Sequence, residues 1–399
     1  MMNRRKLLKT IGLGAVVAGL PGISFSKTNG DSRLVMIVLR GAVDGLALVA
    51  PYGDSKYQSV RGELAIPSPG QHGGLLKLDG MFGLHPSMKS TYELYQHNQL
   101  LPIHAIASPY RERSHFDGQD ILENGVTRAG DKRDGWLNRA LKPLGRGLGD
   151  EAAIALSQNT PLILRGHNSV TSWAPSKLPD ADDDTLRRIA SMYSTDAFFS
   201  MRLEQALASQ KVAGGMDGMN ARMRHNDRAQ SKAMAQAAAR FLRAPTGPRI
   251  AVLEAGGWDT HANQGAASGS LANKFSALDE GIAELRKELG PVWDKTVVMV
   301  VTEFGRTVKV NGTRGTDHGT ATAALLLGGA VNGGKVMSDW PGLSNRDLYE
   351  GRDLYPTMDV RSLFKGVLEE HLLLPENFVE RVVFPDSGDA RPVRDIIRV

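Results

Sequence analysis

The chain has 399 residues, 41% hydrophobic and 23% charged, a composition typical of a globular protein with one large core or two smaller ones. The first 26 residues contain four cationic residues and no acid, so they account for most of the formal charge of +5. The rest of the chain has no basic stripe that would indicate nucleic-acid binding. The lack of cysteine excludes disulfides, thiolate ligands and a cysteine nucleophile, so a metal would need oxygen and imidazole ligands.

The first 26 residues have the pattern of an export signal. Arg4-Arg5 precedes an apolar stretch over 11–20, and small residues at Ser24 and Ser26 predict cleavage before Lys27. The arginine pair is typical of the twin-arginine pathway, so we expect its translocase as a partner and the periplasm or cell surface as destination. The alternative is an uncleaved anchor, although the apolar stretch is short for a membrane span, and after cleavage we expect no stable span.

After this leader, short apolar runs alternate with amphipathic segments. The continuous run over 34–39 predicts a strand buried on both faces, and further runs lie at 100–106, 162–164, 250–253, 297–301 and 323–327. Apolar residues spaced three or four apart from Leu271 to Leu289 predict a helix that ends at Gly290-Pro291. The alternation predicts an α/β three-layer sandwich with a mostly parallel central sheet.

A polar stretch rich in methionine and alanine over about 180–245 interrupts this alternation. We interpret it as a helical insertion within a single domain over 27–399. The alternative is that these helices only cover one face of the sheet.

Polar residues gather in five segments, four of which follow a predicted strand directly or within a few residues, and ligands bind at the carboxyl ends of parallel strands. The five segments concerned are Arg40-Gly-Ala-Val-Asp44-Gly45, Arg113-Ser-His-Phe-Asp117, Glu254-Ala-Gly-Gly-Trp-Asp259-Thr-His261, Thr302-Glu303-Phe304-Gly-Arg306 and Thr316-Asp-His318-Gly319. Taken singly, each also fits a turn or a hydrogen-bonded structural histidine. Together they supply carboxylates, imidazoles and a hydroxyl, a set suited to a divalent metal, and we expect them to converge in one cleft.

Ser114 has two interpretations. It lies between arginines and before a segment, 118–122, that is expected to open a helix, so its hydroxyl is placed where backbone N–H groups and guanidinium groups would bind an anionic ester. A serine activated by a metal could attack phosphorus or sulfur. The alternative is a helix cap, because Ser114 with Asp117 three residues later resembles a capping arrangement.

Several motifs resemble the exported bacterial family called domain of unknown function 1501. They are Arg40-Gly-Ala-Val-Asp-Gly, Ser108-Pro-Tyr-Arg-Glu-Arg-Ser-His-Phe-Asp, Asp134-Gly-Trp-Leu-Asn-Arg, Gly256-Gly-Trp-Asp-Thr-His, Thr302-Glu-Phe-Gly-Arg-Thr, Thr316-Asp-His-Gly-Thr and Leu348-Tyr-Glu-Gly-Arg-Asp-Leu. This family is in turn similar to the alkaline phosphatase and sulfatase superfamily, whose members bind one or two divalent metals around a Ser, Thr or modified Cys nucleophile. The resemblance therefore implies an alkaline phosphatase-like fold.

The resemblance also implies roles for individual residues. Ser114 lies near the position of the nucleophile, and the positions that resemble metal ligands are Asp44, Glu254, Asp259, His261 and His318. Glu303-Phe304 stands where the superfamily usually has an Asp-His pair, which puts one of the two metal sites in doubt.

Two functions follow as expectations. The first is a metal-dependent hydrolase of phosphate or sulfate esters, with Ser114 as nucleophile and with Arg113 or Arg306 binding the non-bridging oxygens. Its metal, which would be zinc, calcium, magnesium or manganese, would be held by some of Asp44, Asp259, His261, Glu303 and His318. The second is a binding or assembly protein of the envelope that keeps the fold without turnover and recognises an anionic polymer or a partner.

Overall fold

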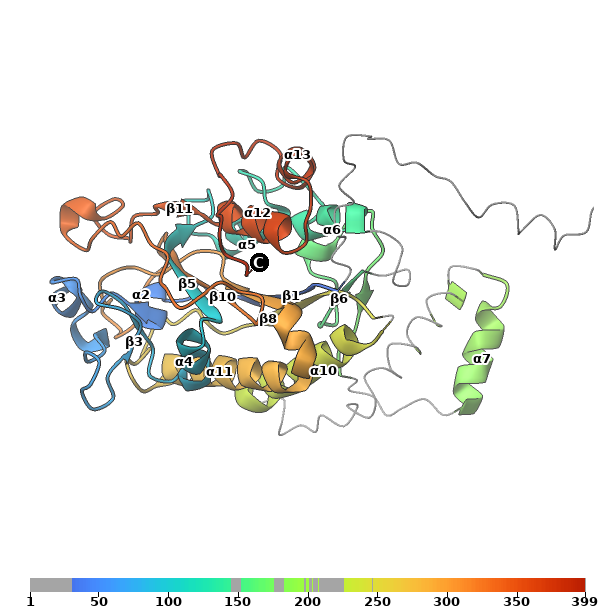
Figure 1. Ribbon diagram of the computed structural model, residues 1–399, viewed down its shortest axis with the longest axis horizontal. Coiled ribbons are helices and arrows are strands. Elements are labelled where there is room, and N and C mark those ends of the chain that lie inside the picture. Colours follow the sequence, from blue (N-terminus) through green and yellow to red (C-terminus); the bar gives the residue numbers. More distant parts are fainter. Residues whose placement is uncertain are drawn as a thin grey trace, which may run out of the picture. The chain divides into compact units, whose positions relative to one another are not determined.

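The apolar run after the leader forms β1 (Arg33–Leu39), a buried strand inside an eight-stranded sheet with the order β11-β5-β10-β9-β1-β8-β6-β7 (Figure 1). β1 pairs in parallel with β8 and β9. β10 runs antiparallel to its neighbours β9 and β5, while the other pairs are parallel. The other strands of the sheet are β5 (Leu100–Ala107), β6 (Ala153–Ala155), β7 (Thr171–Ser172), β8 (Ile250–Ala255), β9 (Thr296–Val301), β10 (Thr322–Leu327) and β11 (Met358–Asp359). The predicted mostly parallel α/β sheet is thereby confirmed.

The computed structural model describes residues 31–144, 152–175, 183–196, 199–200, 203, 207, 226–245 and 247–398. The predicted leader, with Arg4-Arg5 and the cleavage position before Lys27, lies outside these residues, as do parts of the predicted insertion. Within the described parts of the chain, no helix has both the length and the apolar composition needed to span a membrane.

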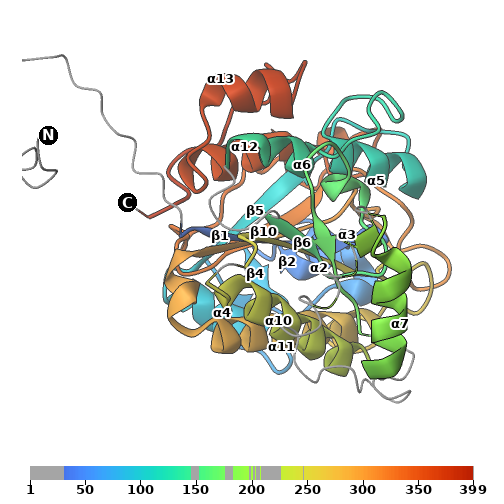
Figure 2. The ribbon, with the colours of Figure 1, turned by 90° about the vertical axis from the view of Figure 1, so that its right-hand side faces the viewer.

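Two layers of helices enclose the large sheet (Figures 1 and 2). One face is covered by α4 (Lys89–Gln96), α10 (Asp227–Arg243) and α11 (Ser270–Leu289), the other by α5 (His115–Asn124), α6 (Trp136–Ala140) and α12 (Val360–Glu370). The further helices are α2 (Gly45–Leu48), α3 (Tyr57–Arg61), α7 (Asp183–Tyr193) and α13 (Glu376–Phe378), with short 3-10 turns η1 (Gly62–Leu64), η2 (Lys142–Leu144), η3 (Leu162–Leu164), η5 (Gly290–Lys295) and η6 (Asn345–Asp347) and a π-helical turn η7 (Val379–Val383).

Alternate residues of β1 enter two separate cores, because successive side chains of a strand point to opposite faces. Val35, Ile37 and Leu39 pack in the core under α10 and α11. Leu34, Met36 and Val38 pack in the core on the other face. Burial of each such side chain stabilises the fold by roughly 1.5–3 kcal/mol, so the continuous apolar run requires a covered sheet.

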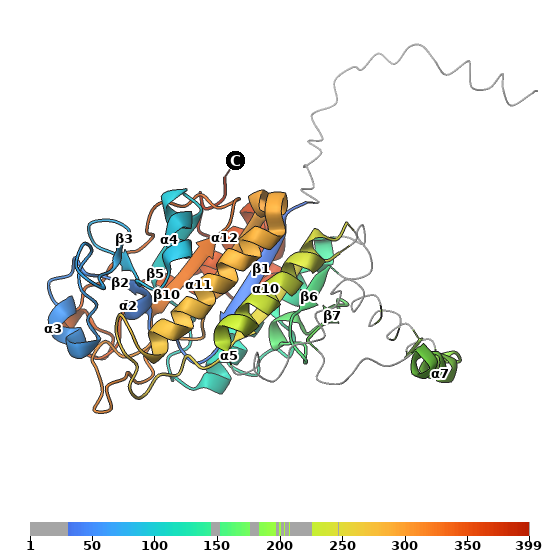
Figure 3. The same ribbon diagram turned by 90° about the horizontal axis from the view of Figure 1, so that it is seen from below.

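The helix predicted over 271–289 is α11, and it lies beside α10 along the sheet (Figure 3). α10 falls inside the predicted insertion, yet Phe241, Leu242 and a series of buried alanines join it to the core. α10 therefore helps to cover this face of the sheet. The single-domain boundaries and the extent of an insertion stay predictions.

The strand predicted over 162–164 is wrong. Residues Leu162–Leu164 form η3, in which Leu164 N and Arg165 N donate to the carbonyls of Pro161 and Leu162. The run is only three residues long and follows a proline, so local turn hydrogen bonds form in place of a ladder. The short strands β6, β7 and β11 were not predicted. A separate small sheet is formed by β2 (Val49–Ala50), β4 (Gly83–Leu84) and β3 (Leu76–Lys77).

Candidate metal centre

Four polar side chains meet at one edge of the large sheet. Asp259 and His261 follow β8, His115 opens α5 after β5, and His318 lies in the segment before β10. The carboxyl ends of parallel strands share an edge, and the start of the reversed strand β10 lies at that same edge. Topology therefore brings together residues that are far apart in the chain.

The three imidazoles surround the Asp259 carboxylate at short distances. Asp259 Oδ1 lies 2.9 Å from His261 Nε2 and 3.2 Å from His318 Nε2, and the two Nε2 atoms are 3.1 Å apart. His115 Nε2 lies 3.5 Å from Asp259 Oδ2. Four-coordinate zinc sites use bonds of about 2.0–2.2 Å to such atoms, which places neighbouring ligand atoms about 3 Å apart. His115, Asp259 and His318 each offer a ligand atom, and these three atoms lie within 4.8 Å of one another, which is compact enough for one ion. His261 Nε2 lies close to two members of this group, Asp259 and His318.

Each of the three imidazoles is oriented by a hydrogen bond at its Nδ1 atom. His115 Nδ1 lies 2.9 Å from Glu303 Oε1, and His261 Nδ1 lies 3.1 Å from Asp317 Oδ1. His318 Nδ1 lies 2.9 Å from the Arg113 carbonyl oxygen. Because these oxygens only accept, we assign the proton of each neutral ring to Nδ1, so that each Nε2 presents a lone pair. Metal-binding histidines are held in this way by carboxylates and carbonyls.

With the ring protons on Nδ1, the Nε2 atoms of His261 and His318 face only acceptors, the Asp259 carboxylate and each other. The lone pairs of His261 and His318 face each other, an arrangement that is unfavourable without a cation or a proton between them. His115 Nε2 is buried and has no hydrogen-bond partner among the described residues. Buried polar atoms without partners are uncommon and indicate a bound ion or water. Three imidazole nitrogens and a carboxylate fit a divalent cation such as zinc.

The charge states of the surrounding groups agree with this donor set. Burial alone would raise the pKa of Asp259, but the hydrogen bond and charge of Arg306 outweigh it and hold this pKa below its usual value. Burial likewise opposes ionisation of Glu303, yet hydrogen bonds from Gln119, His115 and the Gly41 amide lower its pKa. Burial lowers the pKa of His318, outweighing the Arg113 carbonyl and the Asp259 charge that raise it, and this favours the neutral form of the ring.

Glu303 lies behind the centre and holds His115. Its side chain is fully buried and accepts hydrogen bonds from the Gly41 amide, the Gln119 amide and His115 Nδ1 at Oε1, and from the Thr302 hydroxyl at Oε2. This carboxylate was predicted as a metal ligand. In the structure it contacts the cluster through the His115 ring.

Arg306 reaches the cluster as a partner of Asp259. Its buried guanidinium donates to Asp259 Oδ1, and its other nitrogens donate to the hydroxyl and the carbonyl of Thr316. All three nitrogens are thus engaged within the protein. The group predicted to bind substrate oxygens is instead placed to orient Asp259.

The structure does not bring Asp44 or Glu254 into the cluster. Asp44 is 1% exposed, forms an ion pair with the fully buried Arg61 and accepts from Gln264 Nε2 at 2.7 Å. It also caps α2 through the Ala47 amide. Glu254 forms an ion pair with Arg40, which also lies 2.7 Å from Glu123. Both carboxylates are neutralised by arginines that no local pattern in the sequence associates with them.

Arg113 also differs from the prediction. Its guanidinium binds Asp353 and Glu350, and only its backbone carbonyl contacts the cluster, through His318. An arginine so paired is not free to clamp a substrate. The next residue, Ser114, occupies the N-cap position of α5 but makes no capping hydrogen bond with its side chain. The predicted helix after Ser114 is present, whereas the capping arrangement is not.

Two residues of the cluster and its surroundings were missed from the sequence. His115 was noted within its motif without a role, and Asp317 was not assigned although it directly precedes His318. The signal for His115 was its position next to Ser114, at the start of a helix that follows a strand. Phe304 is buried and stacks on His115 with ring centroids 5.1 Å apart. It also contacts the His318 ring at 5.3 Å.

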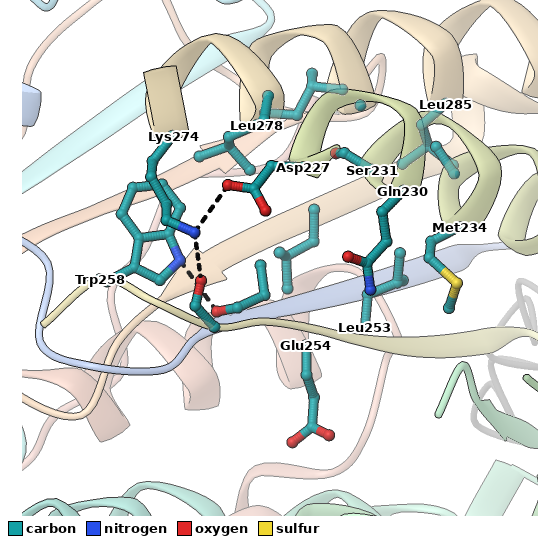
Figure 4. A pocket seen from close by; sticks show the side chains of 17 residues that line it. Asp227, Gln230, Ser231, Met234, Leu253, Glu254, Trp258, Lys274, Leu278 and Leu285 are labelled. Atoms are coloured by element: carbon teal, nitrogen blue, oxygen red, sulfur yellow. Dashed lines mark hydrogen bonds and ion pairs between the residues drawn. The ribbon is translucent and has the colours of Figure 1, made fainter. Parts of the chain in front are cut away.

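A separate apolar pocket of about 280 Å³ lies between β8, α10 and α11 (Figure 4). Leu253, Leu278 and Trp258 are among its lining residues, with Lys274 bound to Asp227 at one side. The Glu254 carboxylate points away from these side chains in Figure 4, toward the other face of the sheet. None of His115, Asp259 and His318 lines this pocket, so it is distinct from the cluster.

This chain matches several solved structures at low sequence identity. The C-terminal periplasmic domain of EcEptC from Escherichia coli, in complex with zinc, matches with a TM-score of 0.39 and 10% identity over 76% of this chain and 74% of that chain. The phosphonate monoester hydrolase of Agrobacterium radiobacter matches with a TM-score of 0.35 and 11% identity over 86% and 74%. The lipoteichoic acid synthase LtaP from Listeria monocytogenes matches with a TM-score of 0.33 and 10% identity over 79% and 68%.

Comparison with curated proteins gives no match. The family described as protein of unknown function (DUF1501) matches residues 31–383, which include the whole cluster and the motifs around it. The chain therefore belongs to the DUF1501 family.

Proposed function

We propose that this protein is an exported, metal-dependent hydrolase of phosphate or sulfate esters. The observation that supports this proposal is the pair of Nε2 atoms of His261 and His318, 3.1 Å apart, with Asp259 Oδ1 about equally close to both. Three oriented imidazoles and an ionised carboxylate form a donor set for one divalent cation. His115, Asp259, His261 and His318 would hold this ion.

A bound divalent cation would stabilise negative charge on ester oxygens and lower the pKa of a nearby hydroxyl. Ser114 is the proposed nucleophile. Its Oγ would form a bond to phosphorus or sulfur while the ester bond breaks and the alcohol leaves, and water would then hydrolyse the serine ester. The absent capping bond leaves this hydroxyl without a helix-capping role, and Ser114 directly precedes His115 in the chain.

Hydrolysis of an aryl phosphate and an aryl sulfate by zinc-loaded protein tests the proposal. We expect Ser114→Ala to abolish hydrolysis while zinc content and melting temperature stay close to those of the wild type. Ser59→Ala, on α3, is a matched control that changes an exposed serine and should keep full turnover. Full activity of Ser114→Ala would exclude covalent catalysis at this serine.

The second candidate function is a binding or assembly protein that keeps the fold without turnover. Phe304 favours it, because an apolar ring fills the place where the superfamily usually has a histidine. Arg113 and Arg306 also form ion pairs with carboxylates of the protein, so fewer charged groups remain free to stabilise a transition state. Zinc binding without hydrolysis of either ester would support this candidate over the hydrolase.

Export through the twin-arginine pathway is a separate part of the proposal and rests on Arg4-Arg5. Replacing both arginines by lysine should retain the protein in the cytoplasm, as measured by cell fractionation. Undiminished arrival in the periplasm would contradict this assignment.

A further inference from the structure

The segment Tyr349–Asp353, part of the motif that begins at Leu348, lies next to the centre. The Asp353 side chain is fully buried, and its Oδ2 accepts from Arg113 Nε at 2.8 Å and from the Thr320 hydroxyl at 2.9 Å. Glu350 Oε2 lies 2.5 Å from Arg113 Nη2. The Arg113 guanidinium also lies over the Tyr349 ring, 5.9 Å from its centroid. Three residues of this segment therefore hold Arg113.

Arg113 has a backbone conformation that residues with a side chain rarely adopt. Its φ is +64°, in the left-handed region, where a Cβ atom is unfavourable. Such strain persists only where the surroundings impose it, and it is concentrated at functional sites. The side chain of this strained residue is bound by Asp353 and Glu350.

The strained conformation has a consequence for the centre. It directs the Arg113 carbonyl to His318 Nδ1, at 2.9 Å, and this acceptor keeps the proton on Nδ1 and the lone pair on Nε2. Arg352, from the same segment, donates to the backbone carbonyl of His318. The His318 ring is thus bound by Arg113, which Tyr349–Asp353 holds, and the His318 main chain is bound by Arg352, which belongs to this segment.

We infer that Asp353 is a positioning residue which, by holding Arg113 at positive φ, orients His318 for metal binding through the Arg113 carbonyl. The inference rests on the metal centre proposed above. Without the Asp353 carboxylate, Arg113 relaxes to a negative φ and its carbonyl turns away from His318. The ring then loses its acceptor, and Nε2 is no longer held toward Asp259.

The test compares glycine with alanine at position 113. Removing Arg113 alone would leave the buried Asp353 charge with only its longer ion pair to Arg352, at 3.6 Å, so both variants carry Asp353→Asn as well. Glycine adopts positive φ freely, whereas alanine does not. We therefore compare Arg113→Gly/Asp353→Asn with Arg113→Ala/Asp353→Asn. The two proteins differ in the free energy needed to hold residue 113 at positive φ, the conformation that directs its carbonyl to His318.

Zinc affinity is measured by isothermal titration calorimetry on metal-free full-length protein. We expect Asp353→Asn and the alanine double variant to bind zinc about 10–100-fold more weakly than the wild type, the usual loss when a group that orients a ligand is removed. The glycine double variant should bind close to wild type. Equal affinity of the two double variants, or wild-type affinity of Asp353→Asn, would overturn the inference.

Two further measurements separate positioning from simple destabilisation and from failure of the proposed function. Asp279→Asn removes another buried carboxylate, which holds the backbone and hydroxyl of Thr91 on the opposite helix layer, and it should leave zinc affinity unchanged. Nitrogen-15 NMR of metal-free protein reports the tautomer of His318. Nδ1-protonated His318 in the wild type and mixed tautomers in Asp353→Asn support the inference even if zinc does not bind, and identical tautomers in the two proteins contradict it.

Discussion

The Nε2 atoms of His261 and His318 lie 3.1 Å apart, and both rings use Nδ1 to bind oxygen acceptors, the Asp317 carboxylate and the Arg113 carbonyl. Neither Nε2 can then donate to the other. A cation between them would relieve the repulsion of the two lone pairs. This relationship leads to the first prediction.

Zinc is expected to stabilise the metal-free protein. Binding to the folded state alone adds about 2.7 kcal/mol when free zinc is a hundredfold above its dissociation constant, and calorimetry would show this as a higher melting temperature. The shift should disappear in His261→Ala and His318→Ala. It should persist in His97→Ala, which changes an exposed histidine at the end of α4. A wild-type melting temperature that does not respond to zinc would contradict the metal centre.

Asp44→Asn is expected to reduce stability and leave the zinc content unchanged. The change leaves Arg61, whose side chain is 0% exposed, without its charge partner, and breaking a buried pair in this way costs about 3–5 kcal/mol. Urea unfolding and metal analysis of the same preparation measure both effects. Loss of bound zinc with unchanged stability would instead restore the metal-ligand role predicted for Asp44.

Gly118→Ala is expected to destabilise the protein although Gly118 lies within the helix α5. Helix propensity alone would favour alanine by about 1 kcal/mol. However, the added Cβ would lie 2.9 Å from Phe304 Cδ1, and overpacking of this kind typically costs about 1–3 kcal/mol. Thermal unfolding decides the sign. Phe304→Leu in the same chain should recover part of the loss, and a more stable Gly118→Ala protein would show that Phe304 has room to move.

Stability is expected to fall as the pH falls from about 6.5 to 4. Burial lowers the pKa of His85, His104 and His371 to about 4, whereas histidine in an unfolded chain titrates near about 6.5. Between these values the unfolded chain binds protons that the folded chain does not, so the free energy of unfolding increases with pH. Each ring contributes up to about 3 kcal/mol, present above pH 6.5 and lost on acidification.

Urea unfolding across this pH range measures the slope. His371→Gln removes one titrating ring but keeps a donor for the Arg33 carbonyl, which His371 Nε2 contacts at 2.8 Å. The variant should lose less stability on acidification than the wild type does. An unchanged slope would show that His371 does not titrate differently in the two states.

The sequence alone predicted the sheet, the helix over 271–289 and the segments that carry polar residues to the sheet edge. These features follow from short stretches of sequence, because a continuous apolar run or a spacing of three or four residues shows how one strand or helix is buried. It did not predict the short strands β6, β7 and β11 or the turn at Leu162–Leu164. The secondary structure of such short segments depends on the residues that contact them from elsewhere in the chain. The reversal of β10 likewise depends on its partners β5 and β9.

Only the tertiary structure decided which polar residues meet. Asp44 and Asp259 both follow buried strands and look alike in the sequence, yet Asp44 lies against the buried Arg61 and Asp259 against histidines from other segments. His115 was overlooked because its partner Glu303 lies 188 positions away in the chain. Whether a carboxylate faces an arginine or an imidazole depends on packing between distant segments, and no local pattern encodes that choice.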